Sequence, residues 1–134
     1  MPTEVLIVLR LLLATGLGAA IGYQRERAGK PAGLRTHMII SVGSALFTIA
    51  SIYGFGPPAD MSRVAAGVVA GIGFIGAGTI IHRGSGDIVG GLTTAATIWA
   101  VAAIGMAAGS GLYLIAGVAT AVTLGILFLP ERFR

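Results

Sequence analysis

The sequence predicts an all-α, polytopic membrane protein, a single domain over residues 1–134 with five transmembrane helices. We expect two parallel hairpin repeats, helices 1–2 and helices 3–4, followed by an additional fifth helix. Composition is the first reason, because 55% of the residues are hydrophobic and only 10% are charged, whereas a soluble domain carries about 25% charged residues. So few polar side chains cannot cover a surface in water, and we expect a lipid bilayer to surround the chain.

Five apolar stretches are the second reason, at approximately 5–23, 36–54, 64–81, 91–108 and 112–129. A helix needs roughly 17–25 such residues to cross a bilayer. Charge predicts the orientation, because Lys and Arg concentrate in cytoplasmic loops. Seven basic residues lie in the first loop, the third loop and the tail, against Arg63 alone on the opposite side. This predicts an outside N-terminus and a cytoplasmic C-terminus, and the Met-Pro-Thr-Glu start lacks the basic region of a cleaved signal peptide.

The first stretch combines small residues with one charge. Ala14, Gly18 and Gly22 recur every four residues, and such spacing lets membrane helices approach backbone to backbone. Arg10 lies about 9 Å into the helix, and we expect its side chain to snorkel to the outer headgroups. Asp60 and Arg63 complete a predicted outer polar cluster, in which a buried Arg10–Asp60 pair is the alternative.

The second stretch carries a polar stripe at intervals of four, three, four and three residues: His37, Ser41, Ser44, Thr48 and Ser51. This spacing places all of them on one helical face. The stripe lines a hydrated path or bonds to neighbouring helices. We favour ordinary packing, because Ser and Thr commonly bond to the backbone and interhelical polar contacts contribute only about 0.6 kcal/mol on average.

The third stretch contains GIGFIGAG, with Gly71, Gly73, Gly76 and Gly78, and thereby satisfies the glycine pattern of a phosphate-binding loop. No strand precedes it, and a loop at this depth would leave backbone groups unpaired at several kcal/mol each. We therefore predict a helix that packs through these glycines. Small residues on almost every face predict that other helices surround it. A helix that unwinds around a ligand is the alternative.

The candidate site for a ligand or partner is the cytoplasmic mouth, where polar residues of three stretches reach the same level. It comprises Arg35, Thr36, His37, Ser41, Thr79, Thr93, Thr94 and Thr97. His82 lies nearby, and Asp87 is expected to cap the fourth helix. The fifth stretch carries Gly117, Ala121 and Gly125, the predicted face of a homodimer.

An internal repeat appears when the chain is shifted by 58 positions against itself. Gly18 then falls on Gly76 and Arg25 on Arg83, and Gly33-Leu-x-Thr36 falls on Gly91-Leu-x-Thr94. We infer two helical hairpins related by an axis along the membrane normal.

The residue inventory also excludes several functions. No Cys is present, and none of the five acidic residues lies well inside a span, so neither a thiolate metal site nor an intramembrane Mg²⁺ cage is expected. No nucleophile–base–acid set is apparent. We expect no enzyme activity, no cofactor, no metal site and no nucleic-acid partner.

Three segments in register resemble the MgtC/SapB family: Lys30–His37, GIGFIGAG followed by Thr79-Ile-Ile, and Gly91–Ala100. The resemblance covers nearly the whole chain and implies a bacterial inner-membrane protein linked to growth at low magnesium and to survival inside macrophages. It also implies a regulator, since one relative inhibits the F-type ATP synthase, which makes that enzyme a possible partner. The chain resembles a short form, because many relatives carry a soluble domain beyond the position of Arg134.

The family's motif positions map onto Arg35, Thr36, His37, Arg63, Gly71, Gly73, Gly76, Gly78, Gly91, Leu92, Thr93, Thr94 and Trp99. The chain departs from the family at Gln24, where relatives often have Glu, and at Gly90, where they often have a basic residue.

The leading hypothesis is a regulator that acts by helix contacts with a membrane partner. The alternatives are a transporter or channel subunit that uses the polar face of helix 2 and the Gly-rich helix 3, and a sensor of Mg²⁺ or pH.

Overall fold

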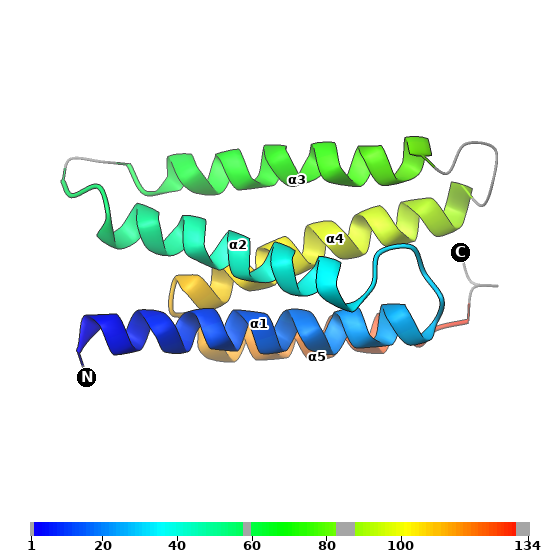
Figure 1. Ribbon diagram of the computed structural model, residues 1–134, viewed down its shortest axis with the longest axis horizontal. Helices are drawn as coiled ribbons and strands as arrows, with labels where there is room; N and C mark the ends of the chain where they lie inside the picture. Colours follow the sequence, from blue (N-terminus) through cyan, green and yellow to red (C-terminus); the bar gives the residue numbers. More distant parts are fainter. Residues whose placement is uncertain (1, 58–59, 83–87, 131–134) are drawn as a thin grey trace.

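The computed structural model describes residues 2–57, 60–82 and 88–130, with the backbone alone at 82 and 88–90. It contains α1 (Thr3–Arg27), α2 (Leu34–Tyr53), α3 (Ser62–His82), α4 (Ile88–Gly109) and α5 (Tyr113–Leu127). The five helices lie lengthwise and alternate in direction, so that the two termini lie at opposite ends (Figure 1). The all-helical prediction is confirmed. The expected roles of Arg83, Asp87, Arg132 and Arg134, and of the His82 side chain, lie outside the described residues.

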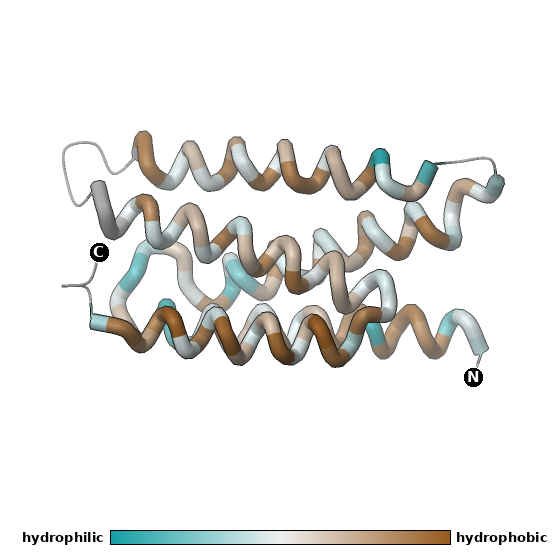
Figure 2. The backbone as a smooth tube through the Cα atoms, turned by 180° about the vertical axis from the view of Figure 1, so that it is seen from behind, coloured by the Kyte–Doolittle hydropathy of each residue, from teal (hydrophilic) through white to brown (hydrophobic). Residues whose placement is uncertain are grey.

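Four helices, α1 to α4, are long and apolar enough to cross a membrane, and hydrophobic residues dominate along them (Figure 2). The fifth predicted span is a helix of 15 residues, about 22 Å long and therefore shorter than a hydrocarbon core of about 30 Å. Its start is set by a turn in which Gly111 has a φ of +93°. We call the end with the N-terminus the Arg10 end and the opposite end the Arg25 end.

The core is a contact of α1, α2 and α4 through small residues. A Cβ added to Gly18 would lie 2.7 Å from the His37 carbonyl oxygen, and one added to Gly22 would lie 2.8 Å from Leu34 Cα. Ala14 is completely buried on the same face of α1. The predicted packing face of the first helix is therefore confirmed.

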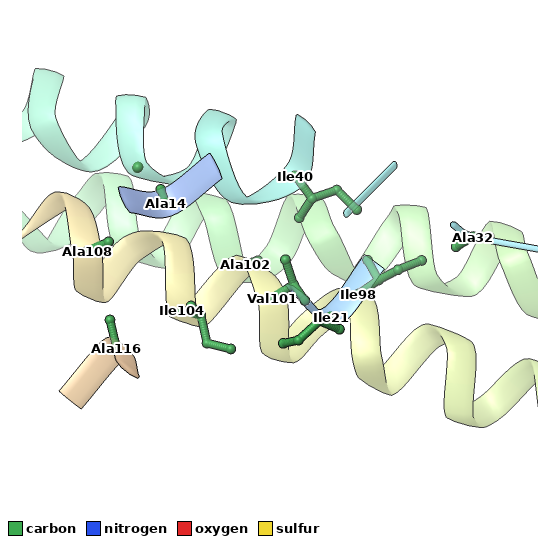
Figure 3. Packing of buried hydrophobic residues seen from close by; sticks show 11 residues of the cluster. Ala14, Ile21, Ala32, Ile40, Ile98, Val101, Ala102, Ile104, Ala108 and Ala116 are labelled. Atoms are coloured by element: carbon green, nitrogen blue, oxygen red, sulfur yellow. The ribbon is translucent and has the colours of Figure 1, made fainter. Parts of the chain in front are cut away.

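The matching surface of α4 is a Gly-x-x-x-Gly pair. A Cβ added to Gly105 would collide with the Ser41 carbonyl of α2, and one added to Gly109 would lie 2.6 Å from the Ala45 carbonyl. Around these glycines the buried apolar residues of α1, α2 and α4 form one cluster, with Ile21, Ile98 and Val101 at its centre (Figure 3). These two glycines were not among the predicted packing residues, although their spacing is the standard signal for close helix contact.

The internal repeat is visible in the contacts. Gly18 of α1 lies against His37 of α2, and the same pair moved 58 positions along the chain, Gly76 of α3 and Ala95 of α4, is also in contact. The Ser44 hydroxyl donates to the Ala102 carbonyl, a residue 58 positions away. Equivalent residues that touch each other lie beside the axis that relates two copies, so this axis passes between α2 and α4.

The position of α3 differs from the prediction. Within residues 62–81 only Gly76 is buried, and a Cβ added to Gly71, Gly73 or Gly78 would meet nothing within 4 Å. The expectation that other helices surround this helix is wrong within one chain: α3 lies at the edge, against α4 and part of α2 (Figure 1). The stretch GIGFIGAG is continuous helix, which excludes the loop interpretation and shows no unwinding.

Candidate functional site

The polar stripe of α2 is used inside the bundle. Ser41 donates to the Ala14 carbonyl of α1 at 2.6 Å, Ser44 to the Ala102 carbonyl of α4 at 2.6 Å and Ser51 to the Met61 carbonyl at 2.9 Å. Thr48 bonds to the carbonyl of its own helix one turn earlier. The packing interpretation is confirmed, and these four hydroxyls do not line a hydrated path in this structure.

Arg10 is a buried residue at the centre of a partly exposed cluster at the Arg10 end. Its Nε donates to the Tyr113 hydroxyl at 2.8 Å, and its Nη1 donates to the Tyr53 hydroxyl at 2.9 Å and the Gly109 carbonyl at 3.1 Å. The guanidinium also lies 5.7 Å from the centre of each tyrosine ring. A Cβ at Gly111 would come within 2.9 Å of Nη2. We name Arg10, Tyr53, Tyr113 and the Gly109 carbonyl the Arg10 cluster; it joins α1, α2, α4 and α5.

The alternative prediction, a buried Arg10–Asp60 pair, is therefore wrong. Arg10 is 9% exposed, and its acceptors are two tyrosines and a carbonyl at the ends of α2, α5 and α4; whether it also reaches lipid headgroups stays a prediction. Asp60 instead accepts hydrogen bonds from the amide of Ser62 at 3.0 Å and its hydroxyl at 2.7 Å, which hold the pKa of the Asp60 carboxyl below its usual value. Arg63 is exposed, so the predicted outer cluster of Arg10, Asp60 and Arg63 is not assembled.

A second buried arginine lies at the Arg25 end, about 22 Å further along α1. Arg25 is 3% exposed, and its Nη2 donates to the Thr94 hydroxyl at 2.9 Å. His37 is completely buried near it, with Nδ1 2.8 Å from the Gly33 carbonyl and Nε2 without a bonded partner among the described residues. Arg25, His37 and Thr94 form the Arg25 cluster, which joins α1, α2 and α4.

The predicted cytoplasmic mouth separates into two groups. His37, Ser41, Thr94 and Thr97 are buried between helices, and Thr97 bonds to the Thr93 carbonyl of its own helix. The remaining four, Arg35, Thr36, Thr79 and Thr93, are partly or fully exposed. Because the buried members fill the contact of α1, α2 and α4, they form a packed layer and not an open entrance.

Between α2 and α3 lies an apolar cleft of about 550 Å³, which we name the α2–α3 cleft. It is lined by Ile39, Ile40, Gly43, Ser44, Phe47, Val64, Gly67, Val68, Gly71, Ile72 and Ile75. A polar hollow of about 350 Å³ adjoins it at Ile39, lined also by Glu26, Pro31, Gly33, Leu34, Arg35 and Thr36. Among the described residues no three His, Cys, Asp or Glu side chains are placed to hold a metal ion.

The burial of Arg25 and the pairing of the two tyrosines with Arg10 were not predicted from the sequence. A signal for Arg25 was present, since it follows Gly22 by three residues and therefore lies on the face of Ala14 and Gly18. The tyrosines carried no comparable signal, because aromatic residues at helix ends are equally typical of the membrane interface.

Comparison with known proteins supplies the family. The model of the MgtC family matches residues 11–134. The chain is 51% identical over 127 residues to "Putative magnesium transporter YhiD" of Escherichia coli K12, covering 90% of this chain and 58% of that protein. It is 42% identical over 136 residues to protein SapB of Bacillus subtilis, covering 96% of this chain and 58% of SapB. For protein MgtC of Salmonella typhimurium the values are 43% over 117 residues, 87% and 49%.

The chain thus spans about half to three fifths of the length of these relatives. No solved structure matches it. The match of the family model covers all five helices apart from the first turns of α1, and the relatives extend over almost the whole chain. With its all-helical bundle and its apolar spans, this chain belongs to the MgtC family.

Proposed function

We propose that the chain is a regulatory membrane module that acts by helix contacts with another membrane protein. The observation that carries this proposal is that polar side chains of α2 lie inside the bundle while small residues of α3 lie on its surface. The hydroxyls of α2 are bonded into the core, whereas a row of small residues on α3, Ala66, Ala70, Gly73 and Ala77, lies exposed. Membrane helices associate through such rows.

The family supplies the physiological setting of the proposal. The relatives' magnesium-related name and the resemblance to MgtC/SapB proteins support a role in adaptation to low magnesium in the bacterial inner membrane. We place the Arg25 end in the cytoplasm, because the connection between α1 and α2 is rich in basic residues. The F-type ATP synthase is one partner to test, and a homodimer through Gly117, Ala121 and Gly125 of α5 is another; all three residues are at least partly accessible.

The proposal is tested by affinity purification from native membranes in mild detergent, with and without magnesium starvation. Gly73→Leu places a large side chain on the exposed row of α3, where no atom lies within 4 Å of the new Cβ, and we expect it to release the partner. Gly16→Leu is the matched control, because Gly16 is equally open on α1. Equal recovery of every co-purified protein with both variants would contradict the contact mechanism through α3.

Transport is the second candidate, favoured by the name of the E. coli relative. Purified protein in liposomes loaded with a magnesium indicator separates the two functions. A contact regulator gives no flux above empty liposomes. Flux that persists in Gly73→Leu and disappears in Ser44→Ala would favour a carrier that uses α2.

A further inference from the structure

The α2–α3 cleft has the dimensions of a thin, extended ligand. On α2 it extends from Ile39 to Phe47, which corresponds to about 12 Å along the helix axis. A helix with side chains has a diameter of about 10–12 Å and would occupy roughly 900 Å³ or more over that length. The cleft offers about 550 Å³, so it does not enclose a whole helix of that length, and it has room for a hydrocarbon chain.

One end of the cleft meets a polar hollow whose lining includes one basic side chain, Arg35, and one acidic side chain, Glu26. Ile39 lines both the cleft and the hollow that contains Arg35 and Thr36. Arg35 is exposed and makes no hydrogen bond or ion pair with the described residues, and the amides of Arg35 and Thr36 lie in the first turn of α2. The first amides of a helix have no partner within it and attract anions.

The acidic group in this hollow is already engaged. Glu26 Oε1 accepts a hydrogen bond from the Leu34 amide at 3.2 Å. Residues 24–35 contain four basic side chains and this one acidic side chain, so the segment around the hollow carries a net positive charge, and Arg35 is the basic side chain that lines the hollow itself. Basic pockets between membrane helices are typical sites for anionic lipid headgroups.

We propose that the α2–α3 cleft binds one acyl chain of an anionic phospholipid, whose phosphate is held by Arg35 and the first-turn amides of α2. The lipid fills the space that α3 leaves beside α2 and thereby attaches α3 to the core. The site lies on the side of α3 that faces α2, away from Gly73, so it is independent of the proposed partner surface.

The preference for an anionic headgroup is tested with purified protein in detergent, to which dioleoyl phosphatidylglycerol or dioleoyl phosphatidylcholine is added. We expect phosphatidylglycerol to raise the melting temperature and to give a one-lipid adduct in native mass spectrometry. Arg35→Gln should weaken this binding about fivefold, the effect of one basic residue near an anionic lipid. Arg27→Gln is the matched control, because it makes the same charge change in the same connection without lining either space.

The cleft is tested by Gly71→Leu, which fills it from α3 where an added Cβ meets no atom within 4 Å. We expect the lipid adduct to disappear, whereas Gly16→Leu, the same change on an open surface of α1, retains it. Melting of both variants without lipid confirms that they are folded.

Three results would overturn the proposal. Equal binding of phosphatidylcholine and phosphatidylglycerol would remove the role of Arg35. Stabilisation by inorganic phosphate that persists in Gly71→Leu would identify a free-anion site. A dimer that Gly71→Leu abolishes while lipid binding is unchanged would assign the cleft to a second copy of the chain.

Discussion

Helices α1 and α3 occupy equivalent positions in the two hairpins, yet only α1 is built into a core. A Cβ added to Gly18 of α1 would lie 2.7 Å from the α2 backbone. A Cβ added to Gly76 of α3 would lie 3.3 Å from the Ala95 side chain and 3.6 Å from the nearest backbone atom of α4. Val68 stands in α3 where α1 has Arg10. The repeat therefore sets the direction of the helices and does not set how tightly they pack.

The fifth helix accounts for much of this difference. Tyr113, its first residue, accepts a hydrogen bond from Arg10, so α5 and the Arg10 cluster hold α1 against α2 and α4. Among the described residues no further helix packs beside α3 in this way. Two copies of one sequence pattern thus give one closely packed helix and one accessible helix, and the accessible helix carries the proposed contact surface and one wall of the proposed lipid cleft.

The largest expected effect comes from filling the tight contact. Gly105→Leu places a side chain against the Ser41 backbone, which cannot move without shifting α2. We expect a loss of about 3 kcal/mol or more in the free energy of unfolding, the upper range for overpacking. The measurement is denaturation in mixed micelles. Gly78→Leu on α3, where a Cβ meets nothing within 4 Å and which does not line the α2–α3 cleft, is the control. Similar losses for both would show that α3 is packed as tightly as the core.

The second prediction concerns the Arg10 cluster. Tyr113→Phe removes the hydroxyl that accepts from Arg10 Nε at 2.8 Å. Hydrogen bonds to charged groups contribute about 1.5–3 kcal/mol, and we expect a loss of this size. A double-mutant cycle with Arg10→Leu is the check: in the leucine background Tyr113→Phe should cost almost nothing. A cost that is unchanged in both backgrounds would mean that the tyrosine stabilises α5 without Arg10.

A smaller effect is expected at the axis between α2 and α4. Ser44→Ala deletes the interhelical hydrogen bond to the Ala102 carbonyl and leaves the close approach of the helices intact. The expected loss is about 0.6 kcal/mol, the average for such contacts in membranes. Thr48→Ala is the comparison, because its bond lies within α2 and its loss should be smaller still.

The packing face of the first helix could be predicted from the sequence, whereas the neighbours of α3 and the acceptors of Arg10 could not. The spacing of Ala14, Gly18 and Gly22 identifies a packing face because small residues matter wherever helices touch. The same argument failed at Gly71, Gly73 and Gly78, because a run of small residues permits contact without specifying which protein supplies the neighbour. Arg10 lies within the first helix as predicted, but its acceptors come from residues 43 and 103 positions away, a distance that no local pattern encodes.

The smallest effect has a sign that separates the two helices. Gly73→Ala adds a methyl group where no atom lies within 4 Å, and alanine is the better helix former. We expect stabilisation of about 0.5 kcal/mol or less, because membrane helices stay helical when they separate and the propensity gain is only partly realised. Gly18→Ala brings the same methyl group within 2.7 Å of the His37 carbonyl and should destabilise by about 1–3 kcal/mol. Denaturation of both variants under one condition measures the contrast.

A destabilising Gly73→Ala would mean that α3 has a close neighbour in the purified protein. The most direct source of that neighbour is a second copy of the chain, which light scattering would detect as a dimer.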